Sequence, residues 1–193
     1  MGHVSHSQFV SYSECNLKWK LRYIDKLGTF TGNIHTLFGT AMHTTIQTYL
    51  TEMYGKSIVA AESLDLNGML KTEMMKEFTT IKNNQEVLPC TQEEMVEFYQ
   101  DGLAILDHFR KHRGKYFMKK NYELVGIELP IFMNLQENVQ LKSYLDVVIR
   151  NKISGRITII DLKTSTRSWT DFQKKDFNKK SQLLLYKQFY SEK

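Results

Sequence analysis

The sequence predicts a fold of the α/β class, on three observations. Apolar residues recur at helical spacing through most of the first 120 residues, runs rich in Val and Ile fill residues 122–164, and one more apolar helix follows. A chain of 193 residues is long enough for one sizeable core. We therefore expect a single domain, with a helical part over about residues 1–120 and a sheet with its last helix over about residues 121–193.

Composition and charge narrow the class of protein. Hydrophobic residues make up 41% of the chain and charged residues 24%, which is ordinary for a globular domain. No apolar run approaches the length of a membrane span and the N-terminus lacks a secretory pattern, so we expect a cytoplasmic protein that does not bind membranes. Cys15 and Cys90 are too few for a disulfide framework or a four-thiolate metal site, and we expect Cys15 to be a packed thiol.

Four stretches predict the helices of the first part. Over residues 7–24, Ser7 and Ser13 are candidate N-caps, and the apolar stripe comprises Phe9, Tyr12, Leu17, Leu21 and Ile24. Helical spacing returns over about residues 38–54 and 62–82. Thr91 and Glu94 form a capping-box pattern that opens a long helix to about Arg113.

The second part predicts strands. Residues 122–134 form one apolar run, and the runs on either side of a polar break that contains Ser154 and Gly155 predict a β-hairpin. Glu128 lies inside the first run, where a charge is unexpected; a solvent-facing position and a functional one fit it equally well. The last helix is expected over residues 181–190.

Asp146 and Asp161 are the residues that point to chemistry. Each carboxylate adjoins a β-branched run, where burial without a partner is costly. Residues two apart in a strand share a face, so Asp161 and Lys163 should project together, with Asp146 nearby if the hairpin is in register. Two carboxylates and an ammonium form a suitable cage for a hard divalent cation and a phosphodiester.

Basic clusters surround this candidate site in the sequence. They comprise Lys18, Lys20, Arg22 and Lys26; the stretch from Lys111 to Lys120; and Lys174, Lys175, Lys179 and Lys180. Thr164, Ser165 and Arg167 add a polar loop. Any one cluster could be a solvated face. Together, and with a net charge of +5, they favour contacts with a nucleic-acid backbone, and we name Lys18, Arg22, Thr164, Ser165, Arg167, Lys179 and Lys180 as candidates.

Two further pairs have helical spacing. Gly39 and His43 lie one turn apart at the start of a helix, as do Gln182 and Tyr186 in the last one. A lone helical His is usually a surface residue or a hydrogen-bonded core residue, so His43 has no function on this evidence alone.

The order of these features resembles the RecB-like subgroup of PD-(D/E)xK nucleases, over about residues 7–190. The matching positions are Gly39 and His43, Glu128, Asp146, Asp161-Leu162-Lys163, and Gln182 and Tyr186. The resemblance implies a restriction-endonuclease-like core, in which a small mixed sheet is flanked by helices, with an N-terminal or inserted helical region.

The resemblance also implies roles for these residues. Asp146, Asp161, His43 and the carbonyl of Leu162 would bind Mg²⁺ or Mn²⁺, and Lys163 would orient water and stabilise the transition state. Gln182, Tyr186 and Glu128 complete the implied catalytic set. The segment from Ser11 to Tyr23 resembles the opening helix of relatives that carry an iron–sulfur cluster, but the three later cysteines of that cluster are absent.

Two departures from the family pattern bear on completeness. Ser143 stands where many relatives have Gly, which could narrow the room behind the site. The chain ends at Lys193, where relatives usually add at least one more strand, so that strand is expected beyond residue 193 or from another subunit or partner.

The function that the resemblance implies is a metal-dependent deoxyribonuclease. It would act as an exonuclease on single- or double-stranded DNA ends, in recombination, repair or phage DNA processing. One alternative is a catalytically silent nucleic-acid-binding module of the same fold. Another is a structural protein in which the carboxylates and Lys163 form a buried salt bridge. Dependence on a divalent metal separates the nuclease from both.

Overall fold

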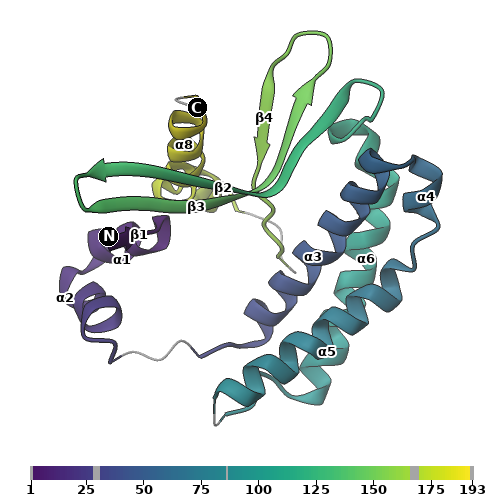
Figure 1. The fold of residues 1–193 in the computed structure, drawn as a ribbon. Helices are drawn as coiled ribbons and strands as arrows, with labels where there is room; N and C mark the ends of the chain where they lie inside the picture. Colours follow the sequence, from purple (N-terminus) through teal and green to yellow (C-terminus); the bar gives the residue numbers. More distant parts are fainter. Residues whose placement is uncertain (1, 28–30, 86, 166–169, 192–193) are drawn as a thin grey trace.

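The computed structural model describes residues 2–27, 31–85, 87–165 and 170–191, without the side chains of Phe172, Gln173 and Lys179. The elements in chain order are β1 (Gly2–Val4), α1 (His6–Glu14), α2 (Asn16–Trp19), the π-helix η1 (Lys20–Ile24), α3 (Ile34–Gly55), α4 (Ile58–Glu62), α5 (Leu66–Asn84), α6 (Gln92–Tyr116), β2 (Tyr122–Gln136), β3 (Val139–Asn151), β4 (Ile157–Ile160), α7 (Asp171–Lys175) and α8 (Phe177–Ser191). The predicted α/β class, with helices around a small mixed sheet, is confirmed (Figure 1).

The sheet is built around β3. Strand β2 pairs with it antiparallel along nearly its whole length, β4 pairs antiparallel with its second half, and β1 pairs parallel with its first residues. The predicted hairpin is confirmed, because Val147 lies opposite Ile160 across a turn that Gly155 enters with a φ of +69°. The short parallel strand β1 carries no sequence pattern that would predict it.

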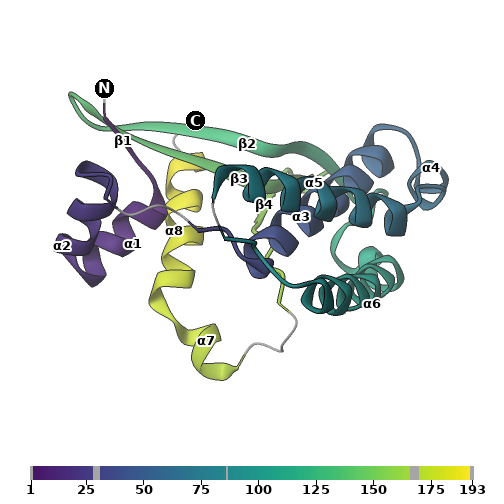
Figure 2. The ribbon, with the colours of Figure 1, turned by 90° about the horizontal axis from the view of Figure 1, so that it is seen from below.

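Helices cover the sheet from two sides. Helix α3 packs against β2 and β3 and is backed by α4, α5 and α6, while α8 packs against β2 and β4 (Figures 1 and 2). The main core lies between α3, its neighbouring helices and the sheet, and a smaller core lies between the sheet and α8. The predicted helical block is therefore a layer that presents α3 to the sheet.

The helix ends confirm some predicted caps and correct others. Thr91 and Glu94 form the predicted capping box of α6. Ser7 and Ser13 are not N-caps: the hydroxyl of Ser5 caps α1, and the sulfur of Cys15 accepts the amide of Lys18 at the start of α2. The predicted packed thiol is wrong, because Cys15 is exposed at this cap.

The apolar stripe of residues 7–24 is largely exposed. The helices α1, α2 and η1 pack mainly on one another, and Tyr12, Leu17 and Ile24 are each more than half exposed. The helices themselves are confirmed, but their apolar face is not covered by the described part of the chain.

None of the described helices combines the length and hydrophobicity that crossing a membrane requires.

Candidate active site

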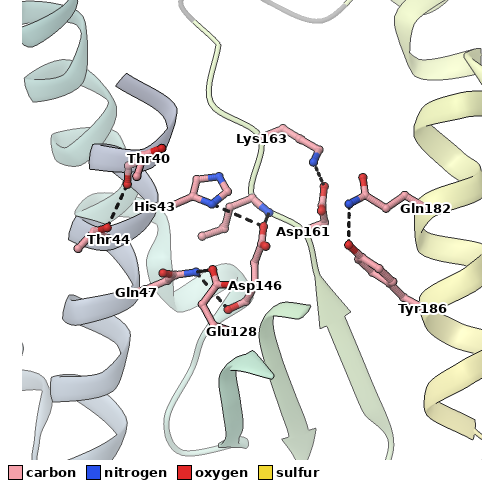
Figure 3. A network of polar contacts seen from close by, with 11 residues as sticks. Thr40, His43, Thr44, Gln47, Glu128, Asp146, Asp161, Lys163, Gln182 and Tyr186 are labelled. Atoms are coloured by element: carbon pink, nitrogen blue, oxygen red, sulfur yellow. Dashed lines mark hydrogen bonds and ion pairs between the residues drawn. The ribbon is translucent and has the colours of Figure 1, made fainter. Parts of the chain in front are cut away.

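An interruption in the hairpin positions the first carboxylates. Leu145 packs in the core beside α8 and Val147 in the core beside α3, although residues two apart in a regular strand share one face. Glu128 lies between the positions opposite Leu145 and Val147, and its φ of +48° is one that a residue with a Cβ rarely adopts. The pleat is broken here, and the side chains of Asp146 and Glu128 are both directed toward α3 (Figure 3).

Three possible metal ligands converge at this break. One ligand atom each from His43, Glu128 and Asp146 lie within 4.8 Å of one another. The Nδ1 of His43 is 3.8 Å from the Oδ2 of Asp146, and the same oxygen accepts the Leu162 amide at 2.7 Å. This brings the predicted His43, from the helical layer, to the carboxylates of the sheet.

Gln47 is a functional candidate that the sequence reasoning missed. Its Nε2 donates to Glu128 Oε1 at 2.7 Å and to the backbone carbonyl of Asp146 at 3.4 Å, and its side chain is buried (Figure 3). Gln47 lies four residues after His43 and so one turn along the same face of α3. That spacing is the signal that could have found it.

Asp161 and Lys163 face one another beyond the end of β4. Lys163 Nζ is 2.8 Å from Asp161 Oδ2, and the carboxylate is almost buried while the ammonium is about half exposed. The prediction that these side chains project together is confirmed, although both lie in the extended segment after β4. The group formed by His43, Glu128 and Asp146 does not include Asp161, which lies on the side of α8 (Figure 3).

The Gln182–Tyr186 pair on α8 lies on the opposite side of the candidate site from α3 (Figure 3). Gln182 Nε2 donates to the hydroxyl of Tyr186 at 2.6 Å, which confirms the shared helix face. Ser143, where many relatives have Gly, is buried and also hydrogen-bonds the buried Tyr186. Burial raises the pKa of Tyr186, and the charges of Asp161 and Asp146 add to this, so the phenol stays protonated.

Burial raises the pKa of Asp146 above its usual range. The charges of Asp161 and Glu128 act in the same direction, against the Leu162 amide and His43. Among the described residues, Asp146 thus lies near the carboxylates of Asp161 and Glu128, and the ammonium of Lys163 pairs with Asp161. This excess of negative charge, with only oxygen and imidazole donors, is suited to a hard divalent cation.

His6 is a second residue that the sequence reasoning missed. Its Nε2 is 2.9 Å from Ser181 Oγ on α8. Burial and the charge of Lys163 lower its pKa, so the start of α1 borders the site. No pattern in residues 2–6 signals this.

The other sequence candidates lie around the site or away from it. A Cβ added at Gly39 would touch Thr164 Oγ1 at an ordinary 3.5 Å, so this Gly brings α3 close to Thr164 without excluding a methyl group. Ser165 and Lys180 are exposed, as are Lys18 on α2 and Arg22 on η1. Arg167 and the side chain of Lys179 lie outside the described residues.

Comparison with protein families decides the assignment. The family model of the PD-(D/E)XK nuclease superfamily matches residues 3–193. The chain belongs to this superfamily. Its members are generally phosphodiester hydrolases that use divalent metals, and the convergent His43, Glu128 and Asp146 fit such a group. No curated protein matches the chain.

Proposed function

We propose that this PD-(D/E)XK protein is a Mg²⁺- or Mn²⁺-dependent deoxyribonuclease, and that it acts as an exonuclease in DNA recombination, repair or phage DNA processing. The observation that carries the proposal is the meeting of His43, Glu128 and Asp146 beside the Asp161–Lys163 pair. The exonuclease part rests on the resemblance to RecB-like relatives, many of which act on DNA ends.

The metal-binding residues in this proposal are His43, Asp146 and Asp161, with Glu128 and the carbonyl of Leu162 as further donors. A bound Mg²⁺ or Mn²⁺ would acidify a water molecule and neutralise charge on the phosphate. The choice of these ions over Zn²⁺ follows from the oxygen-rich donor set, which contains no thiolate.

The chain's own residues supply position and charge. Leu162 fixes Asp146 through its amide, and Gln47 fixes Glu128. Lys163 presents a half-exposed ammonium next to the carboxylates, where it can stabilise negative charge on the phosphate as water attacks phosphorus and the P–O bond breaks. Loss of such a group commonly costs about 10²–10³-fold in rate.

The test is cleavage of end-labelled linear DNA, single- and double-stranded, beside closed circular DNA, with Mg²⁺, Mn²⁺ or EDTA. We expect metal-dependent shortening of linear DNA that is lost in Asp161→Asn and Lys163→Ala. Lys76→Ala is the matched control, because Lys76 is also an exposed lysine in an ion pair, on a helix that adds nothing to the site.

Each other outcome is informative. Cutting of the circles would overturn the exonuclease part of the proposal. DNA binding without cleavage in any metal would overturn the nuclease and favour the silent binding module. Cleavage that survives both substitutions would move the chemistry to other residues.

A further inference from the structure

The exposed apolar face of the N-terminal helices forms a groove. Its walls carry two aromatic rings among aliphatic and polar side chains, and its volume is about 540 Å³. The lining residues are Tyr12, Asn16, Leu17, Trp19, Lys20 and Ile24. The groove is open to solvent, and its apolar lining includes the exposed Tyr12, Leu17 and Ile24. We call it the Tyr12–Trp19 groove.

The aromatic rings of the groove are held in place while one remains open. Tyr12 and Trp19 pack edge to face, with ring centroids 5.3 Å apart and planes at 89°. Tyr12 is nevertheless 53% exposed. A ring fixed by its neighbour and open to solvent can stack on a nucleobase with little loss of entropy, and such stacking contributes about 1–3 kcal/mol per base.

The charge around the groove suits a polyanion. Between Glu14 and Lys26 the chain has four basic residues (Lys18, Lys20, Arg22 and Lys26) against two acidic ones, Glu14 and Asp25, a net +2. Glu14 and Asp25 form ion pairs with Lys18 and Lys20, and both lysines remain largely exposed. Stacking rings bordered by cations are the usual means of binding single-stranded nucleic acid.

Helix α1 links the groove to the candidate active site, because it begins at His6 beside the site and carries Tyr12 further along. His6 forms a hydrogen bond with Ser181. Burial lowers the pKa of His6, which also lies close enough to Lys163 for the lysine charge to lower that pKa further. Tyr12 is six residues further along the same helix, or roughly 9 Å at the helical rise. Figure 2 shows α1 beside α8, with α2 beyond it. A DNA strand held at Lys163 could therefore reach the groove with its next nucleotides.

We infer that the Tyr12–Trp19 groove stacks an unpaired base of single-stranded DNA and gives this protein a preference for single-stranded substrate. The inference rests on the proposed nuclease function and adds its substrate class. A duplex keeps its bases stacked on one another, so it cannot offer a base face to Tyr12 or Trp19 and would gain only the backbone contacts.

The direct test uses tryptophan fluorescence in the whole chain. Trp169→Phe leaves Trp19 as the only tryptophan. In EDTA, where cleavage cannot occur, an oligodeoxythymidylate should quench Trp19, while a duplex of equal length should leave the emission nearly unchanged. No quenching by the single strand at concentrations that bind would overturn the inference.

Substitutions test the two rings by anisotropy of a labelled oligonucleotide. We expect Tyr12→Ala and Trp19→Ala to weaken single-strand binding by roughly tenfold, which corresponds to the stacking of one base, with duplex binding unchanged. Tyr12→Phe keeps the ring and should keep the affinity. Tyr116→Ala is the matched control, because Tyr116 is similarly exposed, at the end of α6.

Failure of this inference can be told apart from failure of the nuclease. Cleavage whose single-strand preference survives Trp19→Ala would overturn the groove and leave the nuclease standing. Quenching of Trp19 without cleavage in any metal would overturn the nuclease and leave the groove standing as a binding site for single-stranded DNA. A dimer in light scattering that becomes monomeric in Tyr12→Ala would show that the groove binds a second copy of the chain, which also overturns the inference.

Discussion

Gln47 holds two parts of the candidate metal site at once, through the carboxylate of Glu128 and the carbonyl of Asp146. Glu128 has a left-handed φ, a backbone conformation that costs energy and needs support from its surroundings. The amide of Gln47, from the neighbouring helix, is part of that support. Residues that orient metal ligands typically contribute 10–100-fold to metal affinity or activity.

We therefore expect Gln47→Ala to raise the Mn²⁺ concentration needed for half-maximal cleavage by about tenfold or more. The measurement is the Mn²⁺ concentration for half-maximal activity. Thr48→Ala, at the next position but exposed, should change neither this value nor the maximal rate. An unchanged half-maximal concentration in Gln47→Ala would show that Glu128 is held without it.

At the scale of elements, the helical layer depends on how closely α6 approaches its neighbours. A Cβ at Gly102 would lie 2.5 Å from Leu70 Cδ2 on α5 and 3.1 Å from Phe38 Cε2 on α3. Leu70 is completely buried, so its methyl group would have to shift within the core. Overpacking of this kind typically costs 1–3 kcal/mol.

Gly102→Ala should therefore lower the melting temperature by several degrees, at about 2–4 °C per kcal/mol for a chain of this size. Gly114→Ala is the control in the same helix, because an added Cβ there meets no atom within 4 Å. It should raise stability by up to about 1 kcal/mol through helix propensity. Equal effects of the two substitutions in thermal unfolding would contradict the close packing at Gly102.

The same scale shows which elements the sequence predicts and why. The long helices and the hairpin were predictable because their apolar residues repeat at the helical or strand period over many positions. Strand β1 has three residues and exists only by pairing with β3, and α7 is a single short turn of five residues. Segments this short cannot show a repeat of apolar residues, so whether they form a strand or a helix depends on their contacts with the rest of the fold.

Local spacing predicted the parts of the candidate site whose residues lie close in the sequence, whereas only the family resemblance linked His43 to the carboxylates. Asp161 and Lys163 lie two residues apart just after β4 and face each other, and Gln182 and Tyr186 share a helix face because of their spacing of four. The contact of Gln47 with Glu128 joins positions 81 residues apart. It depends on the interrupted pleat at Asp146, which the alternating pattern of the sequence does not reveal.

At the scale of the whole molecule, the site lies where the helical layer packs on the sheet. Without a bound metal, the charge of its largely buried Asp146 carboxylate destabilises the folded protein. The pKa of Asp146 is raised in the folded state, chiefly by burial. A raised carboxyl pKa favours folding only where the group is protonated. That stability is complete below the unfolded pKa and disappears as pH rises through the folded value. At neutral pH the charged Asp146 therefore destabilises the metal-free protein.

Asp146→Asn should accordingly melt at a higher temperature than the wild type in EDTA at pH 7–8. A gain of about 1 kcal/mol corresponds to roughly 2–4 °C. The difference should shrink as the pH falls through the raised pKa of the wild-type carboxyl, where that group takes up its proton. Mn²⁺ should reverse the order, because binding to the native state stabilises the wild type while the variant has lost a ligand. An Asn variant that melts lower in EDTA at every pH would mean that the Asp146 charge supports the fold, as the buried salt-bridge alternative requires.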